Sequence, residues 1–158
     1  SGLLYSDSVE GDTLLIITGE IMSQTSLQGS CLCGSVTYKV IGEVKGFYHC
    51  HCQRCRKATG TGHASNLRMS PQNCLSWLQG EELLAQYKVP EAERFYNNFC
   101  TRCGSSMPRV VPELEVVFVP AGSLDSDIPI KPEARIFWES RTSWSCAGDL
   151  PVYKEYVS

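Results

Sequence analysis

Short segments in which apolar and polar residues alternate make up most of the chain, and sustained helical periodicity is scarce. These segments are separated by glycine and proline, which is typical of a protein built from strands. The predicted strands cover residues 36–41, 45–49, 62–69, 74–78, 82–87, 94–99, 114–119 and 135–138. One short helix is expected over 53–59, stopped by Gly60, and a second is expected to begin with Ser70 as N-cap and Pro71 in its first turn. The pattern predicts a mainly β fold with short helical inserts.

The first 21 residues differ from the rest because they contain no cysteine or histidine. Their Ser-Gly opening resembles a remnant of expression cloning, so Met22 is expected to be the native start. Residues 14–18 have the character of an added strand, paired with the domain itself or with a neighbouring molecule. A chain of 158 residues that is 42% hydrophobic supports one substantial core. We therefore expect an N-terminal extension over 1–21 and a single domain over 22–158.

Charge and hydropathy argue against two classes of partner. The net charge of −3 and the pI near 5.6 offer no long-range attraction to a phosphate backbone. The longest apolar stretch near the start, residues 14–17, is far shorter than a membrane span and lacks the basic flank of a secretory signal. We expect no nucleic-acid partner, no membrane partner and a cytoplasmic location, and the oligomeric state stays open.

Cysteine is the outlier of the composition, with nine residues, of which seven fall in three tight groups. The groups are Cys31 with Cys33; Cys50, Cys52 and Cys55; and Cys100 with Cys103. A disulfide framework is disfavoured because the count is odd, no export signal is visible, and the C-x-C spacing suits an unstrained bridge poorly. The groups therefore favour metal binding, whereas Cys74 and Cys146 are interpreted as buried apolar residues.

Zinc accounts for this grouping better than an iron-sulfur cluster, because the spacings do not follow ferredoxin patterns. Residues i and i+2 of an extended segment point to one side, so each C-x-C pair presents two sulfurs together, and C-x-x-C forms a zinc-binding turn. If the first and third groups join in a four-cysteine site, that site is full and structural. The middle group then has three ligands and an open fourth position, which is how a catalytic zinc is built. The alternative is that His49, His51 or a distant residue closes it.

Four segments carry a strong resemblance to a known family. They are G-S-C-L-C-G-S-V (29–36), H-C-H-C-Q-R-C-R-K-A-T-G (49–60), F-C-T-R-C-G-S (99–105) and V-P-A-G-S-L-D (119–125). The chain resembles the glutathione-dependent formaldehyde-activating enzymes, a family that includes centromere protein V relatives, from about Gly29 to Tyr153. One departure is Arg135, which stands where the family is expected to have histidine in a P-x-x-H-I stretch.

The resemblance implies an Mss4-like fold, a β-rich tent of antiparallel sheets, with two zinc ions per chain. It implies a structural zinc at one set of cysteines and a second, labile zinc at another. These sets are Cys31, Cys33, Cys100 and Cys103 for the first and Cys50, Cys52 and Cys55 for the second. The family activity is carbon-sulfur lyase chemistry, which interconverts S-hydroxymethylglutathione with glutathione and formaldehyde.

The chemistry of three thiolates agrees with that activity. Zn²⁺ with three thiolates has a local charge of −1 and is a weak Lewis acid for water, whereas an arriving thiol would be deprotonated and poised to add to a carbonyl carbon. Arg56 and Lys57 are candidates to bind a carboxylate of glutathione, and His63 and His49 are candidate proton shuttles near the substrate. The sequence thus predicts a zinc-dependent lyase with a small thiol such as glutathione as partner. A non-catalytic zinc-stabilised interaction module and a thiol redox protein are the alternatives.

Overall fold

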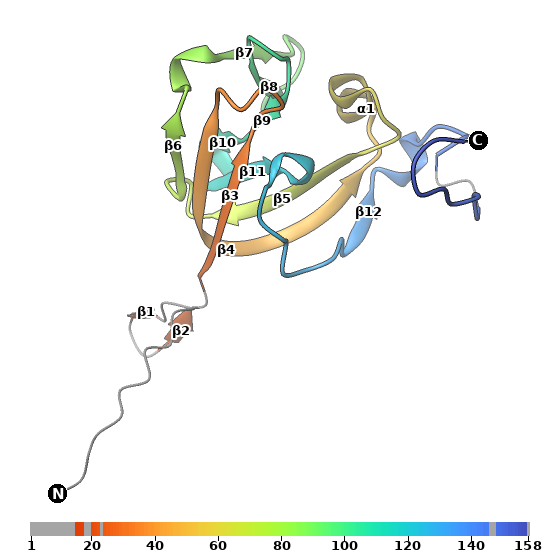
Figure 1. Cartoon of the computed structure of the whole chain (residues 1–158). Coiled ribbons are helices and arrows are strands. Elements are labelled where there is room, and N and C mark those ends of the chain that lie inside the picture. The colour runs from red at the N-terminus through yellow and green to blue at the C-terminus, as the bar shows by residue number, and fades with distance from the viewer. Residues whose placement is uncertain (1–14, 18–19, 23, 146–147, 158) are drawn as a thin grey trace, which may run out of the picture.

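The computed structural model of the chain describes residues 15–17, 20–22, 24–145 and 148–157, and strands dominate it (Figure 1). The strands are β1 (Leu15–Ile17), β2 (Glu20–Met22), β3 (Thr25–Ser30), β4 (Thr37–Cys50), β5 (Ala64–Ser70), β6 (Leu75–Gln79), β7 (Leu84–Lys88), β8 (Tyr96–Cys100), β9 (Ser106–Met107), β10 (Arg109–Val111), β11 (Val116–Pro120) and β12 (Ala134–Ile136). The helical elements are α1 (Gln53–Thr59) and the 3-10 turns Glu81–Leu83, Pro112–Leu114, Ala121–Ser123 and Trp138–Ser140.

The long strand β4 organises the largest sheet. Its first half pairs antiparallel with β3 and β6, and its second half pairs antiparallel with β5 and parallel with β12. The sheet continues from β5 to β11 and β10. The predicted strands 36–41 and 45–49 are therefore one strand, which passes through an irregularity between Val44 and Gly46. Because β4 ends at Cys50, the sheet delivers the second cysteine group to one of its ends.

A smaller antiparallel sheet of β7, β8 and β9 carries Cys100 at the end of β8 (Figure 1). Of the strand predicted over 14–18, residues 15–17 are described and form β1, whereas 14 and 18 lie outside the described residues. The pairing expected with the domain or a neighbouring molecule is not observed, because β1 pairs with β2 in a separate sheet. No helix among the described residues is long and apolar enough to cross a membrane. The fold is mainly β with antiparallel sheets, as predicted.

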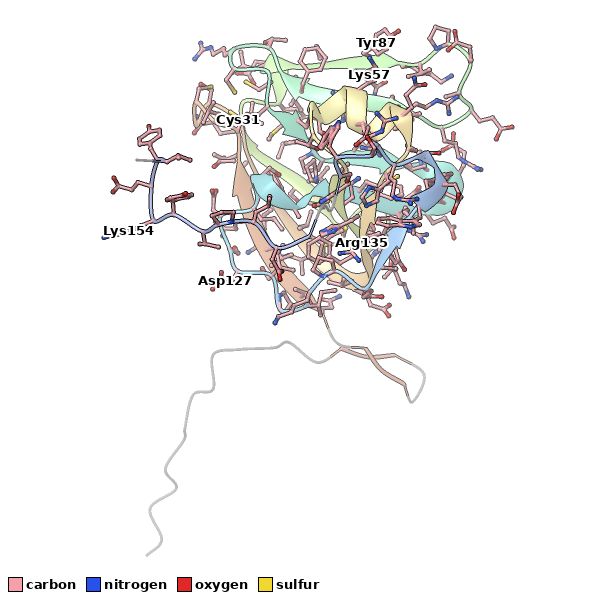
Figure 2. All side chains as sticks on the ribbon, turned by 90° about the vertical axis from the view of Figure 1, so that its right-hand side faces the viewer. Cys31, Lys57, Tyr87, Asp127, Arg135 and Lys154 are labelled. Carbon is pink, nitrogen blue, oxygen red and sulfur yellow. The ribbon has the colours of Figure 1, made fainter. Side chains whose placement is uncertain are left out.

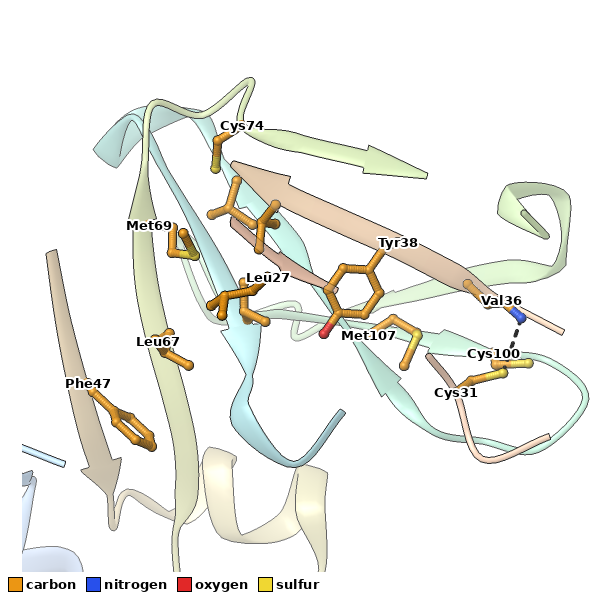
Figure 3. Packing of buried hydrophobic residues seen from close by; sticks show 13 residues of the cluster. Leu27, Cys31, Val36, Tyr38, Phe47, Leu67, Met69, Cys74, Cys100 and Met107 are labelled. Atoms are coloured by element: carbon orange, nitrogen blue, oxygen red, sulfur yellow. Dashed lines mark hydrogen bonds between the residues drawn. The ribbon is translucent and has the colours of Figure 1, made fainter. Parts of the chain in front are cut away.

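The hydrophobic core lies against one face of the large sheet, and 13 buried residues form it (Figure 3). They are Leu27, Cys31, Val36, Tyr38, Val40, Phe47, Leu67, Met69, Cys74, Cys100, Met107, Val117 and Val119. Alternation along β5 explains this arrangement, because Leu67 and Met69 are buried on one face whereas Asn66 and Arg68 lie on the other. Gly29 permits close packing here, since a Cβ there would overlap the ring of Tyr38.

The predicted helices have different outcomes. Helix α1 covers the predicted residues and ends at Gly60, which adopts the left-handed conformation. The helix predicted to begin at Ser70 is wrong, because residues 71–73 form a turn instead. Within that turn the amide of Cys74 donates to the carbonyl of Pro71, and Ile41 then donates to Cys74, so the chain returns to β4 at once and leaves no length for a helix.

Candidate metal centres

The first centre joins two turns that are far apart in the sequence. Cys31 and Cys33 lie in the turn after β3, Cys100 ends β8, and Cys103 lies in the turn that follows. The sulfur of Cys33 is 3.5 Å from that of Cys31 and 4.0 Å from that of Cys100, and all four sulfurs lie within 4.8 Å of one another. A tetrahedral zinc with Zn-S distances of about 2.3 Å needs sulfurs roughly 3.8 Å apart, so this donor set fits zinc.

Neighbouring polar groups favour the thiolate form of Cys103, whereas burial raises the pKa of Cys100. The amide of Val36 donates to the sulfur of Cys31 over 3.3 Å, and the hydroxyl of Ser105 lies 3.3 Å from the sulfur of Cys103. Hydrogen bonds from the Ser105 side chain and backbone lower the pKa of Cys103 to about 5. Ser105 also accepts a hydrogen bond from the amide of Leu32, so it ties the two turns together. Since Cys31 and Cys100 are part of the hydrophobic core, the centre continues that core and is suited to a structural role.

The second centre lies where β4 passes into α1. Cys50 ends the strand, Cys52 is the N-cap of the helix, and Cys55 lies one turn into it. The amide of Cys55 donates to the sulfur of Cys52 over 3.4 Å, so the helix start holds that sulfur in place. A hydrogen bond from Cys55 lowers the pKa of Cys50 to about 6, whereas the same bond and burial raise the pKa of Cys55.

Three cysteine sulfurs make up this second group, which lies within a 4.8 Å limit like the first. Over the part of the chain that the structure describes, no histidine, aspartate or glutamate joins it. Cys146 lies outside the described residues, and Cys74 is buried in the core. The donor set again fits zinc, and the two groups differ in that one has four sulfurs and the other has three.

A cavity of about 1070 Å³ opens beside the second centre. All three of its cysteines line the cavity, whereas none of the four cysteines of the first centre does. The lining combines aromatic and charged side chains, which include Tyr48, Asn66, Phe95, Phe118 and the arginines 54, 68, 94 and 109. The volume is at the upper end of the range for small-molecule sites, which is roughly 300 to 1,000 Å³. The three-cysteine centre is therefore accessible to a ligand from this cavity.

The predicted substrate contacts Arg56, Lys57 and His63 do not line the cavity. Lys57 lies on α1 (Figure 2), and Arg56 directs its Nε toward the carbonyl of His51 at 3.4 Å. Substrate contact by these three residues stays a prediction, and the cavity offers other cations.

The three histidines of the chain gather away from the cavity. His49 follows Tyr48 in β4 and so faces the side of the sheet opposite to Tyr48 and Cys50. It stacks on His63 with ring centroids 4.0 Å apart, and His51 lies 5.1 Å from His63 and from Trp138. Burial lowers the pKa of both His49 and His51. The three rings therefore pack together outside the lining of the cavity.

The sequence reasoning missed Arg68 and Arg109, which line the cavity from β5 and β10. A signal was present for Arg68, which alternates with the apolar Leu67 and Met69, whereas Arg109 precedes two consecutive valines and gives no alternation. The pattern alone did not reveal that the two strands belong to one sheet beside Cys50.

Comparison with known proteins agrees with this geometry. A family model described as glutathione-dependent formaldehyde-activating enzyme matches residues 26–140. A Halomonas elongata protein described as a candidate glutathione-dependent formaldehyde-activating enzyme is 34% identical over 131 residues, which cover 75% of this chain and 78% of that relative. The crystal structure of a Rhodobacter sphaeroides protein, a structural genomics target, is similar with a TM-score of 0.50 and 24% identity. The match covers 69% of this chain and 99% of the Rhodobacter chain. That likeness concerns the fold.

Proposed function

The chain belongs to the glutathione-dependent formaldehyde-activating enzyme family, and on this basis we propose that it is a zinc-dependent carbon-sulfur lyase that acts on a thiol-aldehyde adduct such as S-hydroxymethylglutathione. The observation that carries the proposal is the contrast between the two centres. The four-cysteine centre merges with the core, whereas the three-cysteine centre faces a large cavity. A full set of thiolates suits a structural zinc, and three protein ligands suit a zinc that accepts a substrate atom.

The reaction proposed is the reversible addition of a thiol to formaldehyde. In the forward direction the sulfur forms a bond to the carbonyl carbon, the thiol gives up its proton, and the carbonyl oxygen gains one to become a hydroxyl. When bound at Cys50, Cys52 and Cys55, zinc would favour the thiolate over the thiol form of the incoming sulfur.

The fold positions the three cysteines and leaves them open to the reactants. The strand end fixes Cys50, the helix start fixes Cys52 and Cys55, and the cavity admits the thiol and the aldehyde to the same place. Holding two reactants together converts a bimolecular step into an effectively unimolecular one. Among the described lining residues, Tyr48, Glu91 and Glu93 are the groups besides cysteine and arginine that can exchange a proton.

Exchange between glutathione and S-hydroxymethylglutathione at equilibrium tests the proposal. Magnetisation transfer by NMR is expected to show faster exchange with the zinc-loaded protein than with buffer, and the acceleration is expected to vanish in Cys52→Ala. Cys74→Ala, which removes a buried sulfur outside both centres, is the matched control and should retain it. Equal exchange rates in the presence and absence of the wild-type protein would refute the lyase assignment.

A further inference from the structure

Three lining residues of the cavity, Arg109, Phe118 and Arg68, lie side by side on neighbouring strands. Strand register pairs Arg109 with Phe118 and Phe118 with Arg68, so β10, β11 and β5 place these residues side by side on the face away from the core. The guanidinium carbon of Arg109 lies 5.0 Å from the centroid of the Phe118 ring, and that of Arg68 lies 5.9 Å from it. Arg109 also lies 5.5 Å from the ring of Phe95. The aromatic rings therefore hold both guanidinium groups in place without neutralising them.

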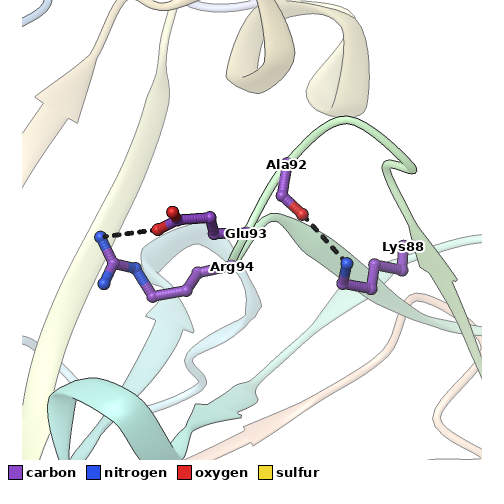
Figure 4. A network of polar contacts seen from close by, with 4 residues as sticks. All are labelled: Lys88, Ala92, Glu93 and Arg94. Atoms are coloured by element: carbon purple, nitrogen blue, oxygen red, sulfur yellow. Dashed lines mark hydrogen bonds and ion pairs between the residues drawn. The ribbon is translucent and has the colours of Figure 1, made fainter.

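Within the described part of the chain, neither arginine makes a hydrogen bond or an ion pair with a carboxylate. The Nε–H groups of Arg68 and Arg109 are buried and donate to no protein acceptor. The ion pairs of the described residues involve other side chains: Lys45 with Glu43, and Arg94 with Glu93 (Figure 4). Burying a cation without an anion is costly, and removing the partner of a buried charge typically costs several kcal/mol. Two such cations in one cavity indicate a site built for an anionic ligand.

The charge of the cavity supports the same conclusion. Four arginines line it against Glu91 and Glu93, which leaves an excess of two positive charges in a chain whose net charge is −3. Burial lowers the pKa of Arg109, and the nearby Cys55, Tyr96, Cys50 and Cys52 act in the opposite direction, so Arg109 lies close to the three-cysteine centre. Arg68 enters the same cavity from β5.

The position of the arginines relative to the cysteines restricts the ligand. In β5, Arg68 lies four positions from Ala64, the residue paired with Cys50, which corresponds to about 13 Å of extended strand. A thiol that contacts Arg68 must span the part of this backbone separation that the arginine side chain does not cover, which favours a thiol longer than free cysteine. A peptide-sized thiol has the required length, since an extended residue spans roughly 3.3 to 3.6 Å.

We propose that Arg68 and Arg109 bind a carboxylate of the thiol substrate and so select peptide-sized acidic thiols, with glutathione as the first example. The inference rests on the proposed function for the sulfur end of the substrate. The guanidinium fork matches a carboxylate in a bidentate arrangement, and charge-assisted hydrogen bonds are the strongest of their kind. These two residues replace Arg56 and Lys57 as the carboxylate contacts.

The first experiment varies the ligand and leaves the protein intact. Cobalt replaces zinc in the wild-type protein, and the cobalt-thiolate absorption is titrated with glutathione, glutathione diethyl ester and N-acetylcysteamine, a thiol without a carboxylate. Glutathione is expected to bind about 10- to 100-fold more tightly than the other two. Equal affinities of glutathione and its diethyl ester would overturn the assignment of the arginines while leaving the proposed function in place.

The second experiment varies the protein. Arg68→Met and Arg109→Met are each expected to weaken glutathione binding by about tenfold or more and to leave N-acetylcysteamine binding unchanged. Arg141→Met is the matched control, because Arg141 also lies over an aromatic ring, that of Trp138 at 4.3 Å, and is outside the cavity. If Arg109→Met lowers metal content and weakens both thiols equally, Arg109 serves the cysteines and its assignment here is wrong.

If the proposed function is wrong, the cobalt titration has a different outcome. In that case no thiol alters the cobalt absorption of the wild-type protein. Calorimetry with S-methylglutathione, which keeps both carboxylates and lacks the thiol, then still decides the role of the arginines. Binding that is lost in Arg68→Met and retained in Arg141→Met supports the carboxylate site, and binding that is equal in the two variants refutes it.

Discussion

Replacing Cys103 with serine is expected to destabilise the protein more than replacing Cys52. The first centre joins segments in which Cys33 and Cys100 are 67 positions apart. If the metal acts as a cross-link, the entropy of closing a loop of this length corresponds to about 4 kcal/mol at 25 °C. The second centre lies within the short stretch from Cys50 to Cys55, for which the same relation gives about 2 kcal/mol. A protein of this size loses roughly 2 to 4 °C of melting temperature per kcal/mol.

Calorimetric melting of the zinc-loaded variants, with metal content measured on the same samples, checks this difference. Cys103→Ser is expected to lower the melting temperature by on the order of 10 °C, and Cys52→Ser by about half as much. Each variant should lose one zinc, so metal loss alone cannot account for the difference. Identical melting temperatures for the two variants would refute the division into a structural and a substrate-facing centre.

Three further predictions concern the ligand and the core. Glutathione binding should release a proton and become tighter as the pH rises toward the thiol pKa, whereas S-methylglutathione should bind more weakly and release no proton. Calorimetry in two buffers of different ionisation enthalpy measures the affinity and the number of protons released. Burial raises the pKa of Tyr38 to about 12 against 10 in the unfolded chain, so the stability that its protonated form contributes is complete below pH 10 and is lost as the pH rises to 12. In chemical denaturation the free energy of unfolding of the wild type should fall by roughly 3 kcal/mol relative to Tyr38→Phe over that range. The same pH dependence of stability in both proteins would contradict this. Gly29→Ala should cost about 1 to 3 kcal/mol in the same assay because its Cβ meets the Tyr38 ring, whereas Gly122→Ala, whose Cβ meets open space, should cost little.

The alternatives to an enzyme make different predictions for the second centre. A thiol redox protein requires a reversible disulfide among Cys50, Cys52 and Cys55 and little metal. A non-catalytic module requires no thiol binding in the cavity. The cobalt titration and the metal content separate both from the lyase.

The local sequence pattern determined most strands, the helix α1 and the three short cysteine motifs, whereas the meeting of the first and third motifs in one centre depends on the fold. Strand alternation, a stop at Gly60 and ligand spacings of one or two intervening residues are properties of a few consecutive positions, so they can be recognised without knowing the fold. Strand β3 was missed because its Gln28 and Gly29 weaken the apolar signal, and pairing with β4 along its whole length holds it in the sheet.

Tertiary structure alone decided what surrounds the three-cysteine centre. Arg56 and Lys57 are adjacent to Cys55 in sequence and yet do not line the cavity, whereas Arg68 and Arg109 are distant in sequence and do. The reason is that a helix turns successive side chains to different sides, while sheet register brings residues from separate strands onto one face. Strand order and register depend on long-range pairing, and no short stretch of sequence specifies them.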